Sequence, residues 1–454
     1  MKKELFSNEI TILRDTFRRL LRRRAKTNII KLIDKTHPAD LALLFRYFNE
    51  NEQGEIFNDL KPSEDTAEFL NELDESISIR LIENESPERI AQILEYASSN
   101  EQAYLMGLID NTYASSVIDL LKAEKQEELE EMMAYPEDSA GILMYTDVFT
   151  LHEETKAKDA IYALQDQEDA EMVFYLYTLD NDGRLTGVIS LRDLVTTSGD
   201  TMLKDIMSKQ IHVVRPETDQ EEVARIVSQY NFLAVPVVDS DDRLLGIVTV
   251  EDVVDVIREE ATEDFLQMVG AGKDREILLK SSWENARMRV PWLFASWVGG
   301  ILAAFIIGVF DNVLQSTIAL AAFIPVIMGM GGNIGTQSST MIVRGLATGR
   351  VSIENSVKIL FKEIRVGLLL GILYGLLLGL FAIFRFIDVS PMIGVVVGLS
   401  IFISMIIAAT IGSLVPLILN RFEIDPAIAT GPFVTTAIDI LGVAFYFIVA
   451  GAFL

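Results

Sequence analysis

The sequence contains no cysteine and only three histidines. The lack of cysteine excludes disulfide bonds, zinc–thiolate sites and thiol chemistry. An intramembrane metalloprotease needs histidine ligands such as those of HExxH, but His37, His152 and His212 all lie outside the apolar segments described below. No Walker motif is present, which argues against an ATPase. The first ten residues lack an apolar h-region, so we expect no cleavable signal peptide. We therefore do not expect an enzyme.

The acidic excess is confined to one part of the chain. Residues 1–280 carry a net charge of −28, whereas residues 281–454 carry +1. We expect no nucleic-acid partner for the acidic part because phosphate binding requires the opposite sign. A cation partner is compatible with it, although a solvated acidic surface is the ordinary reason for such an excess. At 454 residues the chain is too long for one core, so several domains are expected.

Residues 1–135 contain a helical repeat. Residues 37–60 match residues 86–109 at an offset of 49, with identical pairs at Pro38/Pro87, Ala42/Ala91, Tyr47/Tyr96, Asn51/Asn100, Glu52/Glu101 and Gln53/Gln102. Proline in a first helical turn and apolar residues at helical spacing are typical of repeated helix pairs. We expect an all-α N domain that acts as a binding or gating scaffold.

A repeat of another kind follows. Residues 179–193 recur as residues 238–252, and each copy predicts a strand, an Asp-rich turn, a strand and a helix capped by Ser190 or Thr249. This pattern resembles a tandem pair of CBS domains of α/β type, at 136–200 and 201–257. Such domains often bind adenine nucleotides, including ATP, between the two copies. The alternative is that these residues only cap helices.

Residues 258–290 have a charged, helical pattern. We expect a linker helix that joins the CBS pair to a membrane domain.

Five apolar segments follow, at 291–310, 317–343, 366–387, 392–420 and 427–454. A helix needs about 20 apolar residues to cross a bilayer core, so a five-helix transmembrane domain is expected at 291–454. Basic residues set the orientation, and on one side they are Lys280, Arg287, Arg289, Arg344, Arg350, Lys358, Lys362, Arg365 and Arg421. The loops on the opposite side contain only Arg385. We therefore expect a multi-pass cell-membrane protein with a cytoplasmic N-terminus and its C-terminus outside.

The last apolar segment contains one acid, Asp439, and no basic residue. A carboxylate at this depth costs roughly 2.5–3.5 kcal/mol, so it normally faces a polar cavity or an ion path. Pro432 removes a helical hydrogen bond upstream, and Thr435 and Thr436 add oxygen atoms. Oxygen ligands suit a hard cation. The alternative is an Asp that is hydrogen-bonded to a neighbouring helix.

The second apolar segment contains two amides, Asn333 and Gln337, at positions i and i+4. Gly331 and Gly335 form a small-xxx-small pattern that allows close helix approach. Hydrogen bonding between helices is the alternative to an ion path for the two amides.

Together these features resemble the MgtE family of magnesium channels over essentially the full length. Two membrane motifs carry the resemblance most specifically, at residues 328–337 (MGMGGNIGTQ) and 425–439 (DPAIATGPFVTTAID). The resemblance implies a homodimer in a lipid bilayer, with a pore on the dimer axis between the second and fifth spans. Asp439 would be the ion-binding residue of this pore, near Asn333, Gln337, Thr435 and Thr436.

The resemblance also implies regulatory sites outside the pore. Magnesium ligands are expected at Asp219, Glu221, Asp252, Asp255, Glu260, Glu263, Asp264 and Asp425. Nucleotide contacts are expected at Ser190, Arg192, Asp193 and Phe232. Two features depart from the family. Asn231 stands where relatives often have Asp, and the segment 96–102 lacks an obvious acidic pair.

These features lead to one hypothesis of function. Like-charged cytoplasmic domains would repel until Mg²⁺ bridges their carboxylates, and the compact state would press the linker helix against the pore. The transported ion would then close its own channel. An exchanger driven by sodium or protons is a second transport hypothesis. A membrane adaptor without transport is a third, but it would leave Asp439 unexplained.

Overall fold

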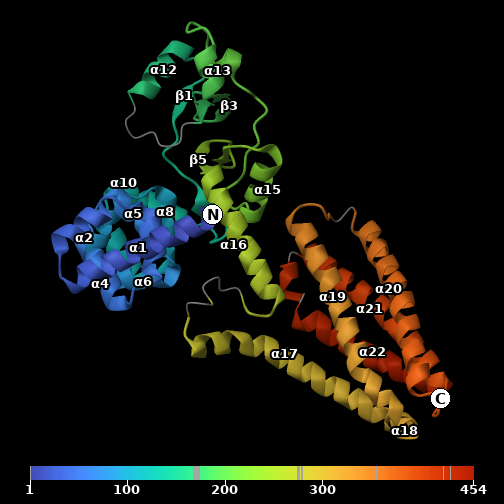
Figure 1. Ribbon diagram of the computed structural model, residues 1–454. Coiled ribbons are helices and arrows are strands. Elements are labelled where there is room, and N and C mark those ends of the chain that lie inside the picture. The colour runs from blue at the N-terminus through green and yellow to red at the C-terminus, as the bar shows by residue number, and fades with distance from the viewer. Residues whose placement is uncertain are drawn as a thin grey trace. The chain divides into compact units, whose positions relative to one another are not determined.

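The computed structural model describes residues 2–166, 174–272, 277, 280–352, 355–422, 424–429 and 431–454. The chain forms two compact units, Met1–Ile257 and Arg258–Leu454, whose elements are labelled in Figure 1. The predicted architecture is confirmed. It comprises a helical N domain, two α/β CBS domains, a long linker helix and five long apolar helices.

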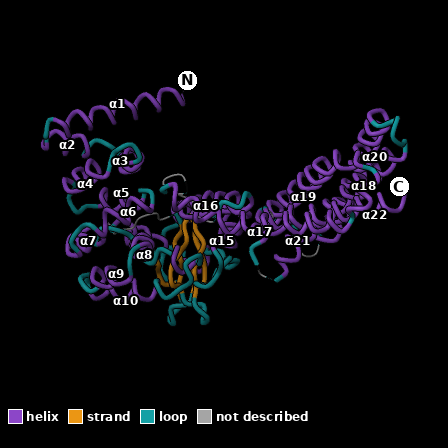
Figure 2. Tube along the Cα trace, turned by 90° about the horizontal axis from the view of Figure 1, so that it is seen from below, coloured by secondary structure: helices purple, strands orange, loops and turns teal. Residues whose placement is uncertain are grey.

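Short helices build the N domain, and they are purple in Figure 2. They are α1 (Lys2–Arg22), α2 (Lys26–Ile33), α3 (Pro38–Phe45), α4 (Glu50–Asp59), α5 (Glu64–Asn71), α6 (Glu75–Glu83), α7 (Pro87–Leu94), α8 (Ser99–Leu108), α9 (Asn111–Ile118) and α10 (Ala123–Met132). The sequence repeat is a repeat of helix pairs. Helices α3 and α7 each begin at a proline, and α4 and α8 follow them.

The CBS region adds strands β1 (Thr150–His152), β2 (Tyr175–Leu179), β3 (Leu185–Ser190), β4 (Ala234–Val238) and β5 (Leu244–Thr249). Its helices are α11 (Ala140–Leu143), α12 (Ala157–Gln165), α13 (Leu191–Thr196), α14 (Leu203–Ile206) and α15 (Gln220–Tyr230). β1 is parallel to β2, which pairs antiparallel with β3, and β4 pairs antiparallel with β5. The predicted caps are present, because the hydroxyl of Ser190 accepts a hydrogen bond from the backbone N–H of Asp193. The hydroxyl of Thr249 accepts one from Asp252 in the same way.

One hydrophobic core joins the N domain to the second CBS domain. It contains Leu129 and Met132 of α10 together with Val223 of α15, Val248 of β5 and Val253. The N domain and this CBS domain therefore share buried apolar surface, which is the main stabilising term in folding.

The linker helix α16 runs from Val250 to Met268. It begins inside the second CBS domain, eight residues before the linker expected at 258–290. It ends in a turn at Gly270 and Gly272, both of which have positive φ. A glycine adopts this conformation at little steric cost, so the turn separates α16 from the first membrane helix.

Five helical segments are long and apolar enough to cross a membrane. They are α17 (Ser282–Val309), η1 with α19 (Ile318–Phe323 and Ile324–Ala347), α20 (Ser356–Arg385), α21 (Met392–Arg421) and α22 (Pro432–Phe453). The short elements between them are α18 (Asp311–Ser316) and η2 (Pro426–Ala429). The third helix starts ten residues before the predicted boundary at 366, because the charged residues before it continue the helix.

Glycines set the closest contacts among these helices. Gly367, Gly371, Gly375 and Gly379 line α20 where it packs on α21. A Cβ built on Gly371 would lie 2.9 Å from the carbonyl oxygen of Phe402. This glycine stripe therefore lets the backbones of α20 and α21 pack closely together.

Candidate functional site

Asp439 lies in the second turn of α22. The helix begins at Pro432, whose fixed φ and missing N–H suit a first helical position. The side chain of Asp439 is half-buried. Among the residues that the structure describes, none forms a hydrogen bond or an ion pair with this carboxylate. The structure therefore offers no support for the alternative of an Asp that bonds a neighbouring helix.

Helix α19 presents glycines to α22 at this level. A Cβ built on Gly332 would lie 3.9 Å from Oδ1 of Asp439 and 4.0 Å from the methyl group of Thr435. A Cβ on Gly331 would lie 3.0 Å from Ile438, and one on Gly335 would overlap that side chain. The small-residue pattern thus brings the backbone of α19 close to the carboxylate. Gly332 was not among the predicted site residues, although it lies inside the quoted motif.

The two amides of the second span lie on an exposed face of α19. Asn333 and Gln337 are both solvent-exposed in the single chain and one helical turn apart. No hydrogen bond from either side chain to another described residue is observed. An exposed amide is costly in hydrocarbon, so this face of α19 is unsuited to lipid.

Thr435 and Thr436 differ in their surroundings. The hydroxyl of Thr435 donates to the carbonyl oxygen of Gly431 at 3.1 Å, so it closes the first turn of α22. Thr436 packs tightly against Gly299 of α17. It also lines an apolar groove of about 370 Å³ between α17 and α22. A pore-lining role for Thr436 stays a prediction.

A second carboxylate lies inside the membrane domain. Glu363 of α20 is only 5% exposed and accepts a hydrogen bond of 3.0 Å from the hydroxyl of Ser338 on α19. Glu363 was not among the predicted site residues, because the third apolar segment was expected to begin only at residue 366. Glu363 is the single acidic residue in the sequence of α20, and this isolation is a signal that could have identified it.

The predicted regulatory acids are dispersed along the chain. Oδ1 of Asp219 accepts from the backbone N–H of Glu221 and caps α15, and Oδ1 of Asp425 accepts from Ala427 and caps η2. On α16, Glu263 accepts a hydrogen bond from Gln267 at 2.9 Å. The other predicted ligands on this helix are Asp255, Glu260 and Asp264. Within the described part of the chain, no three His, Asp or Glu side chains lie close enough to hold a metal ion.

Asp252 has a different environment from the other acids. Its Oδ1 accepts a hydrogen bond of 3.0 Å from Nδ2 of Asn100, which belongs to the N domain. Its Oδ2 accepts from both the backbone N–H and the hydroxyl of Thr249. Burial raises the pKa of the Asp252 carboxyl, and the nearby Glu101 raises it further. Both oxygens are thus engaged by the protein itself.

The predicted nucleotide contacts come from both CBS domains. Ser190 and Asp193 are joined by a hydrogen bond of 2.7 Å at the start of α13, and Arg192 is exposed. Phe232 belongs to a group of stacked rings, because it lies 5.3 Å from Tyr230 and Tyr230 lies 4.1 Å from His212 between ring centroids. A flat aromatic face suits a nucleobase, and an exposed guanidinium suits a phosphate.

Asn231, where the sequence was expected to depart from the family pattern, stands between Tyr230 and Phe232 in the sequence and has a φ of +54°. It ends α15 in the left-handed conformation. Asn and Asp are the residues other than Gly that best tolerate this conformation, so the backbone geometry restricts the residue type at position 231 without distinguishing Asn from Asp.

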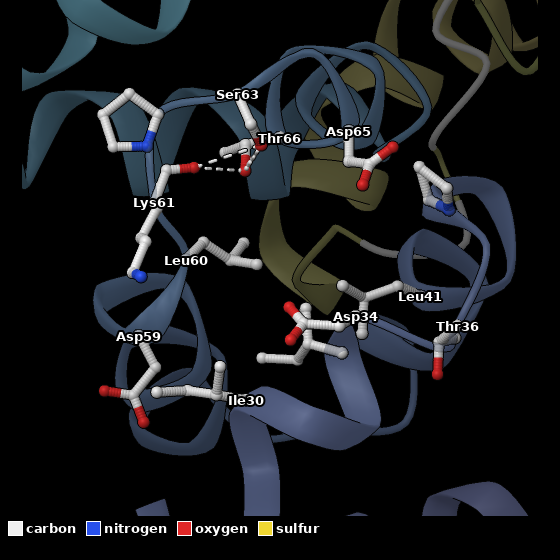
Figure 3. A pocket seen from close by; sticks show the side chains of 13 residues that line it. Ile30, Asp34, Thr36, Leu41, Asp59, Leu60, Lys61, Ser63, Asp65 and Thr66 are labelled. Atoms are coloured by element: carbon white, nitrogen blue, oxygen red, sulfur yellow. Dashed lines mark hydrogen bonds between the residues drawn. The ribbon is translucent and has the colours of Figure 1, made fainter. Parts of the chain in front are cut away.

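The N domain contains a cavity of about 350 Å³ (Figure 3). Three carboxylates surround it, those of Asp34, Asp59 and Asp65. Asp59 forms an ion pair with Lys26, and the hydroxyl of Thr66 donates to the carbonyl oxygen of Lys61. The ion pair joins α2 to α4, and the Thr66 hydrogen bond closes the turn between α4 and α5.

Models of known families match most of the chain. The intracellular N domain of MgtE matches residues 36–138, CBS domains match 140–199 and 203–259, and a divalent cation transporter family, MgtE, matches 324–449. The magnesium transporter MgtE of Bacillus subtilis is 31% identical over 93% of both chains. That of Thermus thermophilus is 35% identical over 92% of this chain and 94% of its own. Inosine-5'-monophosphate dehydrogenase of Methanocaldococcus jannaschii matches only 25% of this chain.

Two solved structures resemble the part of the chain before the membrane helices. The cytosolic domain of the Mg²⁺ channel MgtE in complex with ATP has a TM-score of 0.51 and 33% identity, and covers 54% of this chain and 99% of its own. The soluble part of a magnesium transporter has a TM-score of 0.50 and 29% identity, and covers 56% and 99%. With relatives of this identity over more than nine tenths of its length, the chain belongs to the MgtE family of magnesium transporters.

Proposed function

We propose that the chain is a channel that admits Mg²⁺ down its electrochemical gradient. The observation that carries this proposal is the half-buried carboxylate of Asp439 inside a membrane helix, opposite the glycine backbone of α19. An ionisable group in this position marks an ion path by default. The relative crystallised with ATP is described as a Mg²⁺ channel, which supports a channel rather than an exchanger.

The pore belongs to a homodimer with α19 and α22 around its axis. The exposed amides Asn333 and Gln337 support this arrangement, because a second copy would cover a face that lipid cannot cover favourably. Two Asp439 carboxylates would then face each other across the axis.

This arrangement suits the chemistry of the ion. Mg²⁺ keeps its waters at about 2.0–2.1 Å and is usually bound through one or two carboxylates. A pair of carboxylates attracts the hydrated ion without removing its shell, so the ion can leave again.

Cytoplasmic Mg²⁺ closes the channel by binding to acids of the CBS pair and the linker helix. The candidate ligands are Asp219, Glu221, Asp255, Glu260, Glu263, Asp264 and Asp425. No such site is assembled within the described part of one chain, so ligands must come from more than one element or copy. Binding that favours the compact state shifts the population toward closure. We do not count Asp252 among these ligands, because both of its carboxylate oxygens already accept hydrogen bonds from the protein.

The acidic part lies in the cytoplasm and the C-terminus outside. The basic residues of the loops support this orientation, and the related ATP-bound structure is that of a cytosolic domain.

ATP binds at the CBS pair through Ser190, Arg192, Asp193 and Phe232. The stacked rings beside Phe232 and the exposed Arg192 fit a base and a phosphate, respectively. Isothermal titration of the full chain with ATP tests this assignment, and Arg192→Ala is expected to weaken binding about tenfold. Binding that Arg192→Ala leaves unchanged would place the nucleotide elsewhere.

Patch-clamp recording tests the transport proposal. Currents carried by Mg²⁺ are compared between the intact chain and Asp439→Ala at low and high cytoplasmic Mg²⁺, with Asp388→Ala, an exposed acid outside the spans, as the control. We expect a current that internal Mg²⁺ suppresses and that only Asp439→Ala abolishes. Flux that persists without Asp439 would move the ion site elsewhere, and flux too slow for current would indicate an exchanger.

A further inference from the structure

We propose that the N domain is held on the linker helix by a direct amide–carboxylate hydrogen bond that needs no divalent cation. The bond runs from Nδ2 of Asn100 to Oδ1 of Asp252 over 3.0 Å. It joins the N-terminal turn of α8 to the first turn of α16, which are separated by more than 150 residues in the sequence.

Local bonds fix both partners in this geometry. Oδ1 of Asn100 accepts a hydrogen bond of 2.7 Å from the hydroxyl of Ser98, which directs the Nδ2 group toward Asp252. The Asp252 carboxylate is held from the other side by the backbone N–H and hydroxyl of Thr249. Two side chains that are already oriented lose little conformational entropy when they pair.

A second pair of bonds supports the same contact. The hydroxyl groups of Ser99 and Thr146 lie 2.7 Å apart, and the backbone N–H of Thr146 donates to the Ser99 oxygen at 3.2 Å. Thr146 also donates to Glu128 of α10. Ser99 and Asn100 of α8 therefore bind the CBS region through neutral hydrogen-bonding groups and the Asp252 carboxylate.

The charge at this point explains why no cation is needed. Glu101, which follows Asn100 on α8, already places one negative charge near the Asp252 carboxylate. A carboxylate at position 100 would add a second negative charge about 3 Å from the first, and such a pair is stable only when it is protonated or bridged by a cation. An amide supplies a donor instead and removes the repulsion. The N domain is thus coupled to α16 at any magnesium concentration, and closure by Mg²⁺ must act at other acids.

The repeat within the N domain provides a matched control. Asn51 occupies the position of α4 that Asn100 occupies in α8, and it is exposed. Asn51→Asp therefore adds the same charge to the same helical position without touching Asp252.

The absence of cysteine allows a direct measurement of docking. Cysteines are introduced at two exposed positions, Gln92 on α7 and Gln229 on α15, and carry spin labels. The labelled full chain is diluted with unlabelled chain, and pulsed EPR distances are recorded with EDTA or with Mg²⁺.

We expect one narrow distance distribution for the parent and for Asn51→Asp under both conditions. Asn100→Asp is expected to give a broad distance distribution in EDTA and a narrow one in Mg²⁺. Asn100→Ala is expected to give a broad distribution under both conditions. A parent distribution that broadens in EDTA would overturn the proposal, as would an Asn100→Asp distribution that stays narrow there. Because the measurement does not require transport, it tests the docking contact independently of the proposed channel function.

Discussion

Asp439 of α22 and Gly332 of α19 face each other, so that a Cβ built on the glycine would lie 3.9 Å from Oδ1 of the acid. This distance is an ordinary van der Waals contact, but it leaves no room for a branched side chain. Access to the carboxylate therefore depends on a small residue at position 332.

Gly332→Val is expected to lower Mg²⁺ flux about tenfold, which corresponds to about 1.4 kcal/mol. Its methyl groups would occupy the space in front of the carboxylate, whereas the single methyl of Gly332→Ala fits and should leave the flux within about twofold. Uptake into proteoliposomes measures both variants. Gly308→Val is the control, since in the described part of the chain a Cβ built on Gly308 has no atom of another element within 4 Å. Equal flux in Gly332→Ala and Gly332→Val would show that this space is not part of the ion path.

Gly412→Ala is expected to destabilise the membrane domain by about 1–3 kcal/mol, the usual cost of overpacking. A Cβ on Gly412 would overlap the carbonyl oxygen of Gly335, and a helix backbone cannot move aside. Thermal unfolding of the purified chain in detergent measures the effect. Gly300→Ala is the control, with open space around its Cβ, and should shift stability by less than about 0.5 kcal/mol. Similar melting temperatures for both variants would argue against this helix contact.

The Ser338–Glu363 hydrogen bond is expected to couple α19 to α20. Removing the Ser338 hydroxyl leaves a buried acceptor with one donor fewer, at a cost of about 1–3 kcal/mol. A double-mutant cycle with Ser338→Ala and Glu363→Gln measures the coupling, which we expect at about 0.5–3 kcal/mol. Strictly additive effects of the two substitutions would mean that the two side chains do not interact.

The stability of the Asp-rich turn between β4 and β5 is expected to depend on pH through the ionisation of Asp239. The backbone N–H groups of Arg243 and Asp241 donate to its Oδ1 and hold the pKa of this carboxyl below its usual range. A lowered folded-state pKa contributes stability above the unfolded value of about 3.9, and this contribution is lost as the pH falls through the folded pKa. Asp239→Asn should therefore have a lower melting temperature than the parent at pH 7. The difference between the two melting temperatures should shrink below about pH 4.

Asp241→Asn, in the same turn, controls for the change in net charge. A difference between Asp239→Asn and the parent that stayed constant from pH 7 to pH 3 would contradict the assignment to ionised Asp239.

Local patterns were sufficient to predict most of the fold. Proline at the first turn, the two internal repeats and the lengths of the apolar runs depend on residues close in sequence, and α3, α7, the capped β-hairpins and the five long helices followed from them. The predicted ends of the helices were less accurate than the predicted elements themselves. The start of α20 lay before the predicted span because charged residues can extend a helix beyond the apolar run that identifies it.

The sequence by itself determined the domain order, the membrane segments and the unusual position of Asp439. Composition and periodicity are sufficient for this because they indicate which residues are buried and which face water or lipid. Only the tertiary structure decided which side chains meet. Gly332 faces Asp439, Ser338 bonds Glu363, and Asn100 bonds Asp252. These contacts join residues that are far apart in the chain, and the packing of whole elements sets such distances rather than any local pattern.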